Sequence, residues 1–302
     1  MATAATAFIA EQIEPGVFAG PVRRPVNQAI TAKGSIHDDA TAQKLGLRGG
    51  TVAGSIHLEQ FPPLLAHVLG QRWYRTGSIS LYFKYATRDR EQVRAFARAP
   101  AAGADLARGD VQIPVWMRDE RGEQVAEGTA SVGVPDRDSA LRRRIAATPE
   151  PGELRVFGDL PVGKDVAGIR AELPSQGLDA RFDVITESVA AYRDPGLFGG
   201  RIATPAMLVR ALGGIQEGFL EHGRNYGVRL FGAIELQYYR GPARVDRDYA
   251  LRGRILTLGD TPKTEYYWYE SILVDAETGR DVVGMLMQLR TMKASHPAWQ
   301  TA

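Results

Sequence analysis

The feature that most constrains the fold of this sequence is an internal repeat. Residues 199–219 resemble residues 49–69, and residues 232–255 resemble residues 77–99. In each copy an apolar helical segment is followed by segments of alternating polarity, which are typical of antiparallel strands. Repeats of this kind predict two similar units that pack together. We therefore expect an α+β fold in which each half is a long central helix wrapped by a curved antiparallel sheet.

The predicted helices and strands carry their own boundary signals. Residues 111–134 have the pattern of a hairpin with a turn at residues 119–122, and the second half has a matching turn at residues 275–279. Pro62 and Pro63 interrupt the first apolar helix. A proline pair removes helix hydrogen bonds, so we expect this helix to be kinked or split there.

A charged segment with several prolines, residues 135–153, separates the two copies. It has no sustained apolar period, which indicates a linker between a first domain at residues 1–134 and a second at residues 154–302. Its three arginines at residues 142–144 could contact a phosphorylated cofactor or form a solvated face of the linker. The solvated face is favoured, because runs of charge usually face water.

Composition excludes several classes of function. The chain has 302 residues, no cysteine and a net charge of +2, with 44% hydrophobic and 24% charged residues. The lack of cysteine rules out disulfides, thiolate catalysis and cysteine-based metal sites. The small net charge argues against binding to nucleic acid or to a membrane surface.

No metal-ligand cluster, phosphate-binding loop or dinucleotide-binding glycine motif is recognisable in the sequence, so we expect no metal and no cofactor. The N-terminal residues lack the basic region of a signal peptide, and no apolar run approaches transmembrane length. We therefore expect a cytoplasmic protein.

Candidate catalytic groups concentrate at residues 34–58. A loop with His37, Asp38 and Asp39 precedes a short amphipathic run, a glycine-rich turn and a strongly apolar helix. The first backbone N–H groups of a helix have no intrahelical partner and carry partial positive charge. Gly54 at that helix start leaves room for a ligand oxygen, so the region could hold a developing oxyanion while His37 moves a proton.

This stretch resembles the hydratase motif of MaoC-like enoyl-CoA hydratases and dehydratases. Residues 36–39 match the I-H-x-D part of the motif, and Gly54 matches the glycine whose amide forms the family's oxyanion hole. The resemblance implies a tandem double hotdog fold and a reaction that adds or removes water at the α,β bond of an acyl thioester carried by CoA or a carrier protein. The family's catalytic aspartate lies five residues before the histidine, where this chain has Ala32, and Gly34-Ser35 replaces the family's N-P pair.

From these positions we predict His37, Asp39 and His57 as catalytic residues. Ala32 cannot transfer a proton, so Asp38 or Asp39 would have to supply a carboxylate, although in the family the aspartate after the histidine mainly orders the loop. For His57, a structural role in a buried helix stays open beside a catalytic one. The predicted substrate-binding residues are Gly54, Ser55, Tyr82 and Phe83.

Two further features bear on the reaction. Glu59 keeps a thioesterase activity open, because some hotdog thioesterases use a carboxylate on this helix. His57 and Glu59 lie two residues apart, so at most one of them points at the site. We expect most strand aromatics in the core and some along an acyl tunnel; the set is Tyr82, Phe83, Tyr85, Tyr238, Tyr239, Tyr266, Tyr267, Trp268 and Tyr269.

The second half lacks the I-H-x-D loop, because residues 192–195 run almost directly into the glycine pair that begins the repeat. Thr204-Pro205 stands where the first half has Gly54-Ser55. Threonine followed by proline is a favourable N-cap and first turn, so we expect this helix start to be closed by its own side chain. The second half would then have lost the site and would cover the acyl tunnel.

Two hypotheses follow. The first is a MaoC-like hydratase or dehydratase acting on an acyl thioester. The second, motivated by Ala32, is a double hotdog repurposed for another lyase, isomerase or cyclase step in specialised metabolism, or a non-catalytic acyl-binding protein. Under either hypothesis the expected partner is a small-molecule or acyl-thioester substrate, and a homo-oligomer stays open.

Overall fold

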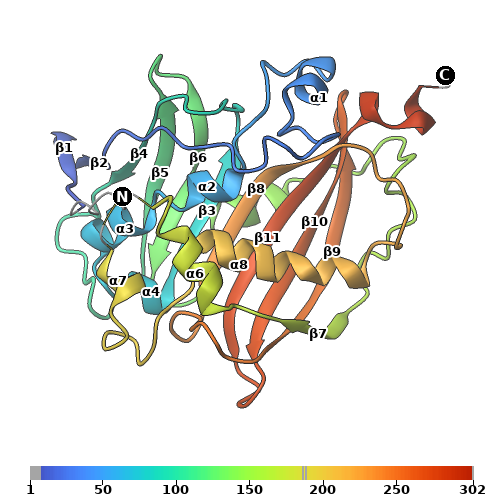
Figure 1. The fold of residues 1–302 in the computed structure, drawn as a ribbon. Helices are drawn as coiled ribbons and strands as arrows, with labels where there is room; N and C mark the ends of the chain where they lie inside the picture. The colour runs from blue at the N-terminus through green and yellow to red at the C-terminus, as the bar shows by residue number, and fades with distance from the viewer. Residues whose placement is uncertain (1–7, 186, 188, 301–302) are drawn as a thin grey trace.

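The computed structural model of the protein describes residues 8–185, 187 and 189–300. In this part of the chain eleven strands form one antiparallel sheet with the order β1-β2-β4-β5-β6-β3-β8-β11-β10-β9-β7 (Figure 1). The strands are β1 (Glu11–Glu14), β2 (Val17–Ala19), β3 (Gly77–Phe83), β4 (Val93–Arg98), β5 (Val111–Asp119), β6 (Gln124–Val132), β7 (Val166–Ala171), β8 (Arg229–Tyr238), β9 (Tyr249–Asp260), β10 (Thr264–Asp275) and β11 (Asp281–Met292).

The helices in the described part of the chain are short. They are α1 (Asp39–Lys44), α2 (Gly54–Leu58), α3 (Pro62–Leu69), α4 (Trp73–Thr76), α5 (Ala140–Ala146), α6 (Ser175–Arg181), α7 (Ala190–Arg193) and α8 (Pro205–Gly213), with the 3₁₀ turns η1 (Gly214–Gly218), η2 (Lys293–Ser295) and η3 (Pro297–Trp299). None of them combines the length and the apolar character that crossing a membrane requires.

The two halves build the same sheet. The strand order is β2-β4-β5-β6-β3 in the first half and β7-β9-β10-β11-β8 in the second. The halves join where β3 pairs with β8, with Ile79 opposite Leu236 and Leu81 opposite Ile234. Both predicted hairpins are present, as β5–β6 and β10–β11. The expected double hotdog is confirmed.

The central helices cover one face of this sheet (Figure 1). The predicted first helix is split, since α2 ends at Leu58 and α3 begins at Pro62. Pro62 and Pro63 occupy the first turn of α3, where a missing N–H removes no intrahelical hydrogen bond. In the second half α8 passes directly into η1. Helices α2 and α8 lie against each other, so the two halves share one core.

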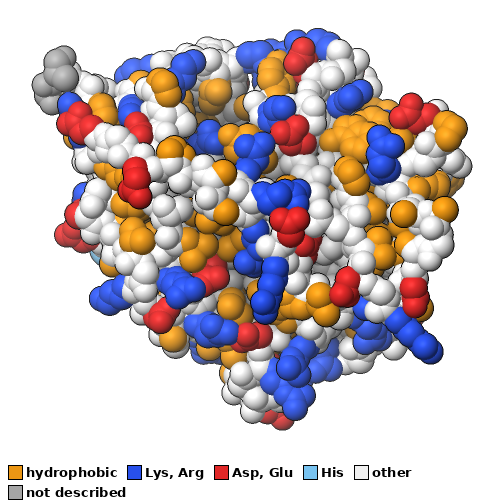
Figure 2. Space-filling model, turned by 180° about the vertical axis from the view of Figure 1, so that it is seen from behind, with side chains coloured by type: hydrophobic (Ala, Val, Ile, Leu, Met, Phe, Trp, Pro, Cys, Tyr) orange, Lys and Arg blue, Asp and Glu red, His pale blue; other side chains and the backbone are white. Residues whose placement is uncertain are grey.

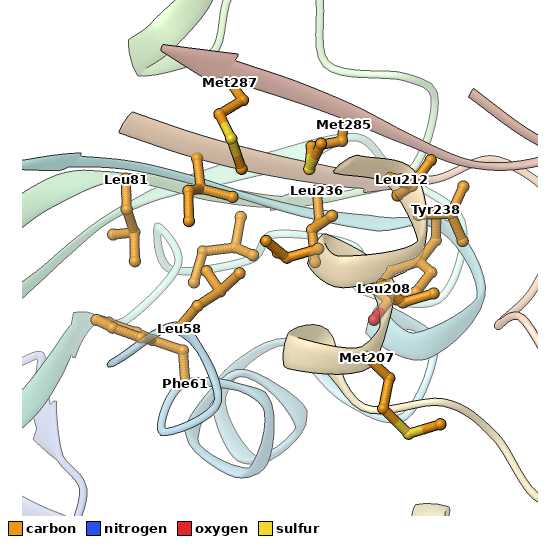
Figure 3. Packing of buried hydrophobic residues seen from close by; sticks show 14 of the residues in the cluster. Leu58, Phe61, Leu81, Met207, Leu208, Leu212, Leu236, Tyr238, Met285 and Met287 are labelled. Carbon is orange, nitrogen blue, oxygen red and sulfur yellow. The ribbon is translucent and has the colours of Figure 1, made fainter. Parts of the chain in front are cut away.

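Fully buried apolar side chains fill the space between these helices and the sheet. Figure 3 shows Leu58 pointing toward the sheet with Phe61 next to it, and Leu208 of α8 in the same cluster. Burying one such side chain stabilises a fold by about 1.5–3 kcal/mol. From the sheet, the same cluster receives Leu81, Leu236, Met285 and Met287.

The predicted linker contains a helix that sequence patterning missed. Helix α5 lies within residues 135–153 and packs Leu141 against Tyr266 and Trp268, on the sheet face away from the central helices. The Ser139 side chain caps it by accepting a hydrogen bond from the Arg142 N–H. With one buried leucine in seven residues, α5 has too weak an apolar period to stand out in the sequence.

Acidic groups of the chain itself pair with the three arginines of α5. The interpretation as a phosphate contact is therefore not supported; Arg142 and Arg144 connect α5 to strands β8 and β6, and Arg143 pairs with a residue just before the helix. Figure 2, seen from this side, shows basic side chains interspersed with acidic ones. The pairs are Arg142 with Glu235 at 3.4 Å, Arg143 with Asp138 at 3.0 Å and Arg144 with Glu127 at 3.2 Å.

Candidate active site

A cavity of about 410 Å³ lies at the start of the first central helix, and both halves line it. The first half contributes the loop at residues 36–37, the turn at 51–54, His57 and the end of β3 with the residues after it, 83–87. The second half contributes Gln216, the start of β8 at residues 229–232 and the end of β11 at residues 289–290.

His37 lines this cavity, and one hydrogen bond fixes its tautomer. Its Nδ1 lies 2.7 Å from the carbonyl oxygen of Thr51. A carbonyl oxygen can only accept, so Nδ1 carries the proton and Nε2 of the neutral ring has a free lone pair. No described residue hydrogen-bonds to Nε2. His37 is therefore oriented as a base, with its acceptor nitrogen available to a ligand.

The loop that carries His37 is held against the glycine-rich turn. The His37 carbonyl accepts a hydrogen bond from Asn27 Nδ2 at 2.8 Å. A Cβ atom on Gly50 would lie 2.3 Å from the same carbonyl oxygen, so only glycine fits. Asp39 Oδ1 accepts from the Gly50 N–H at 2.7 Å. The loop and the turn are thus held together at Gly50, where no side chain fits between them.

Neither aspartate of the loop lines the cavity. Asp38 caps α1, accepting from the Thr41 hydroxyl at 2.7 Å and pairing with Lys33 at 3.3 Å. The hydrogen bond from Thr41 lowers the pKa of Asp38. Asp39, predicted as catalytic, is occupied by its bond to Gly50. Both residues have the contacts expected of groups that order the loop.

The position of the missing aspartate, Ala32, is exposed. Among the described residues that line the cavity there is no aspartate and no glutamate. No other carboxylate therefore takes the place of the missing one in this cavity. In the described parts of the chain, no cluster of histidine and acidic side chains could hold a metal ion.

His57 lines the same cavity and is buried. Burial lowers its pKa to about 4, so it is neutral at pH 7. Gln60 Nε2 lies 3.4 Å from Nδ1 and Thr87 Oγ1 lies 2.7 Å from Nε2. The amide nitrogen of Gln60 donates to Nδ1, so Nε2 carries the proton and donates to Thr87. The Thr87 hydroxyl keeps its own proton to offer within the cavity.

Thr51 supplies a second hydroxyl. Thr51 is 3% exposed, and its Oγ1 is a buried atom with no hydrogen-bond partner among the described residues. Such a group costs free energy unless a ligand or water satisfies it. Nothing in the sequence pattern marked Thr51 or Thr87, since both look like ordinary residues beside strands and turns.

The four predicted substrate-binding residues divide into two pairs. Gly54 and Phe83 line the cavity, and the Phe83 ring lies so close that a Cβ atom on Gly54 would be 2.8 Å from it. Ser55 does not line the cavity. Tyr82 points to the opposite sheet face, where its hydroxyl accepts from Arg290 Nη2 at 2.8 Å. Tyr82 and Phe83 are neighbours on one strand, so their side chains face opposite ways.

Glu59, the carboxylate that kept a thioesterase activity open, lies outside this cavity. Its carboxylate pairs with Arg181 and accepts from the Thr204 hydroxyl at 2.6 Å and the Ala206 N–H at 3.3 Å. The Thr204 side chain makes no cap of its own. The expectation that the second helix closes its own start was wrong, because Glu59 of the first half closes it.

The helix starts also correct the register of the repeat by one residue. Helix α2 begins at Gly54 and α8 at Pro205, so Gly54 corresponds to Pro205 and not to Thr204. The isolated bridges of Thr51 and Ile202 agree with this register.

Most strand aromatics lie in the core, as expected, and two of them hydrogen-bond to Gln216, a residue that lines the cavity. Tyr267 and Tyr269 are fully buried. The Tyr267 hydroxyl donates to Gln216 Oε1 at 2.8 Å, and Gln216 Nε2 donates to the Tyr269 hydroxyl at 3.3 Å. Gln216 lines the cavity and was missed in the sequence, as were Arg229 and Arg290.

No protein-family model and no curated protein matches this sequence. Solved structures do match. A MaoC domain protein dehydratase from Chloroflexus aurantiacus J-10-fl is 12% identical, with a TM-score of 0.65 over 96% of each chain. A MaoC-like dehydratase is 13% identical, with a TM-score of 0.53 over 95% of this chain and 98% of the other.

A third similar structure is a conserved protein from Mycobacterium tuberculosis, essential for bacterial survival during infection, that has a double hotdog fold. It is 12% identical, with a TM-score of 0.58 over 95% of this chain and 96% of the other. These likenesses agree with the strand order and the paired central helices, and the chain is a double hotdog protein with the fold of MaoC-like dehydratases.

Proposed function

We propose that the protein is a hydratase or dehydratase that uses His37 as its one acid–base group on an acyl thioester. The observation that carries the proposal is the 2.7 Å hydrogen bond from His37 Nδ1 to the Thr51 carbonyl. It leaves Nε2 free to act as a base in the cavity that Gly54 also lines, where the resemblance assigns the helix start to the thioester oxygen.

In the dehydration direction, Nε2 of His37 takes the α-proton of a 3-hydroxyacyl thioester. The electron pair of that C–H bond forms an enolate, whose oxygen receives hydrogen bonds from the Gly54 N–H. The enolate then re-forms the carbonyl, the Cβ–O bond breaks, and the leaving hydroxide takes the proton back from the imidazolium. The products are an enoyl thioester and water, and His37 returns to its starting state.

The Thr87 hydroxyl supports this scheme. Its oxygen accepts from neutral His57, so its own proton can be donated to the departing or attacking oxygen. With no aspartate or glutamate among the described residues that line the cavity, one histidine has to take and return the same proton.

The test is a spectrophotometric assay for loss of enoyl-thioester absorbance, on a panel of short to long trans-2-enoyl-CoA substrates. We expect turnover by the wild type and a fall of about 10²- to 10⁴-fold in His37→Ala, the usual contribution of a general acid–base group. Circular dichroism would establish that the variant is folded. A folded wild type that is inactive on the whole panel would contradict the proposal.

The lack of a carboxylate among the described residues that line the cavity also favours a second candidate, double-bond isomerisation. There His37 would move one proton from the γ-carbon to the α-carbon, with no water consumed. Proton NMR of the products separates the two reactions, because hydration yields a 3-hydroxyacyl thioester and isomerisation a shifted alkene.

A further inference from the structure

A groove of about 870 Å³ lies at the place in the second half that corresponds to the reaction cavity of the first. The reaction cavity is lined by the loop before α2, by η1 at the end of the other central helix, and by the start of β8. The groove is lined by the segment before α8, at residues 189–191 and 197–198, by α3 at the end of the other central helix, and by α4, which leads into β3. Helices α1 and α7, which precede the two central helices, accordingly lie on opposite sides of α2 (Figure 1).

The groove differs from the reaction cavity in its polar groups. The start of α8 does not line it, and Glu59 of the first half caps that start. Among the described residues of its lining there is therefore no helix start comparable to Gly54. The place in the fold is that of the reaction cavity, but the lining suits the binding of a ligand and not the stabilisation of an oxyanion.

The charge of the groove comes from arginines that have neutral partners. Arg72 and Arg75 line it, and no aspartate or glutamate of the described chain does. Arg72 Nη1 donates to the Gly109 carbonyl at 2.7 Å, which ties this guanidinium to the loop before β5. Arg75 Nη2 donates to the Leu197 carbonyl at 3.3 Å, and its guanidinium lies 5.1 Å from the centre of the Phe198 ring. A guanidinium without a carboxylate partner keeps its positive charge available to an anionic ligand.

The side chains next to Arg75 are apolar. Leu197 lines the groove and is 44% exposed, which is unusual for a leucine beside a folded core. Phe198 continues this wall, and Pro63 and Ala66 of α3 line the same groove. A ligand that covers such side chains gains free energy by removing apolar surface from water. One positive charge beside an apolar wall matches an anion that is joined to a hydrocarbon chain.

We propose that this groove is a second ligand site of the protein, which binds an aliphatic carboxylate, with the carboxylate on Arg75 and the chain along Leu197 and Phe198. A guanidinium and a carboxylate match in charge and in planar geometry. A free phosphate would match the charge but would leave the apolar wall uncovered. The proposal does not require any reaction at His37, so it stands apart from the proposed function.

The experiment measures binding and does not depend on turnover. Isothermal titration would compare octanoate with octan-1-ol, which have chains of the same length and differ in charge. We expect the wild type to bind octanoate about 10- to 100-fold more tightly, the usual range for hydrogen bonds to a charged group. Arg75→Gln should abolish that preference, and Arg75→Lys should keep part of it. The matched control is Arg118→Gln, since Arg118 is exposed and lines neither the groove nor the reaction cavity.

A second variant locates the bound acid. Ala190 is exposed and lines the groove, so Ala190→Trp places a large side chain there without touching the reaction cavity. We expect this variant, with an unchanged circular dichroism spectrum, to lose octanoate binding and to keep the turnover of enoyl thioesters. Unchanged octanoate binding in Ala190→Trp would overturn the inference, because the acid would then lie elsewhere.

The remaining outcomes also decide the matter. No binding of octanoate by the folded wild type, or equal affinity for octanoate and octan-1-ol, would overturn the inference and leave the chemistry at His37 untouched. Inorganic phosphate that binds as tightly as octanoate would overturn it too and would assign Arg75 to a phosphate. An octanoate preference in a wild type without turnover would support the second site and count against the hydratase alone.

Discussion

The two halves of the molecule build the same sheet but begin their central helices differently. In the first half, Gly50 lies beneath the carbonyl of His37, and the long loop before it closes over the helix start. In the corrected register the second half has Arg201 at the place of Gly50. There the loop is absent, so a large side chain fits and pairs with Asp179.

The helix ends differ as well. The α8 start is neutralised by Glu59, which satisfies the Ala206 N–H, whereas α2 has no side-chain cap and opens to the cavity at Gly54. The first backbone N–H groups of a helix need partners. In one half another side chain provides the partner, and in the other the helix start faces the cavity. A repeat can therefore keep its architecture while only one copy keeps an uncapped helix start beside a cavity.

The largest expected effect comes from removing Glu59, which caps the start of α8. Glu59→Ala leaves the largely buried Arg181 side chain without its carboxylate, with only the neutral Gln28 as a partner, and the start of α8 loses its cap. We expect the free energy of unfolding to fall by about 3–5 kcal/mol, as for other broken buried ion pairs. Urea denaturation measures it. Glu59→Gln, which keeps the hydrogen-bond acceptor, should lose less; equal losses would show that the cap contributes nothing.

The second prediction tests Gly50, the position without a side chain against the His37 carbonyl. Gly50→Ala forces a methyl group against the His37 carbonyl. A shift of the loop by about 1 Å should reduce kcat by about 10²-fold. The control is Arg201→Ala in the other half, which should leave kcat unchanged. Normal activity in Gly50→Ala would mean that the loop position is not needed.

The third effect concerns pH. His57 corresponds to Leu208 in the second half and has a folded pKa of about 4, against an unfolded value near 6.5. The unfolded chain binds the proton more tightly than the folded chain. The contribution of neutral His57 to the free energy of unfolding is therefore fully present above pH 6.5 and is lost as the pH falls toward 4. At pH 5 the loss relative to pH 7.5 is about 2 kcal/mol.

Urea titrations at pH 7.5 and pH 5 would measure that loss. His57→Leu, which copies the second half, should remove this part of the pH dependence. An unchanged difference between the two pH values in His57→Leu would assign it to other groups.

The smallest expected effect tests whether Asp39 orders the loop or takes part in catalysis. Asp39→Asn keeps an acceptor oxygen for the Gly50 N–H, so kcat should stay within about threefold of the wild type. A catalytic carboxylate would lose about 10²-fold or more. The enoyl-thioester assay distinguishes these outcomes.

Local signals accounted for the predictions that the structure confirms. The β5–β6 and β10–β11 hairpins and the split before Pro62 all depend on neighbouring residues, whose turn and proline chemistry is visible in the sequence. Tyr82 lies outside the cavity for an equally local reason. Strand alternation allows only one of Tyr82 and Phe83 to face the cavity.

The sequence by itself determined the repeat, the two hairpins and the loop that carries His37, because these follow from periodicity and from residues close in the chain; the double hotdog followed from the resemblance of that loop to a known motif. Only the tertiary structure decided what surrounds His37. Arg229 and Gln216 line the cavity from the other half, and Glu59 lies outside it and caps α8. Those contacts span well over a hundred residues, and they depend on how β3 pairs with β8, which no local pattern specifies.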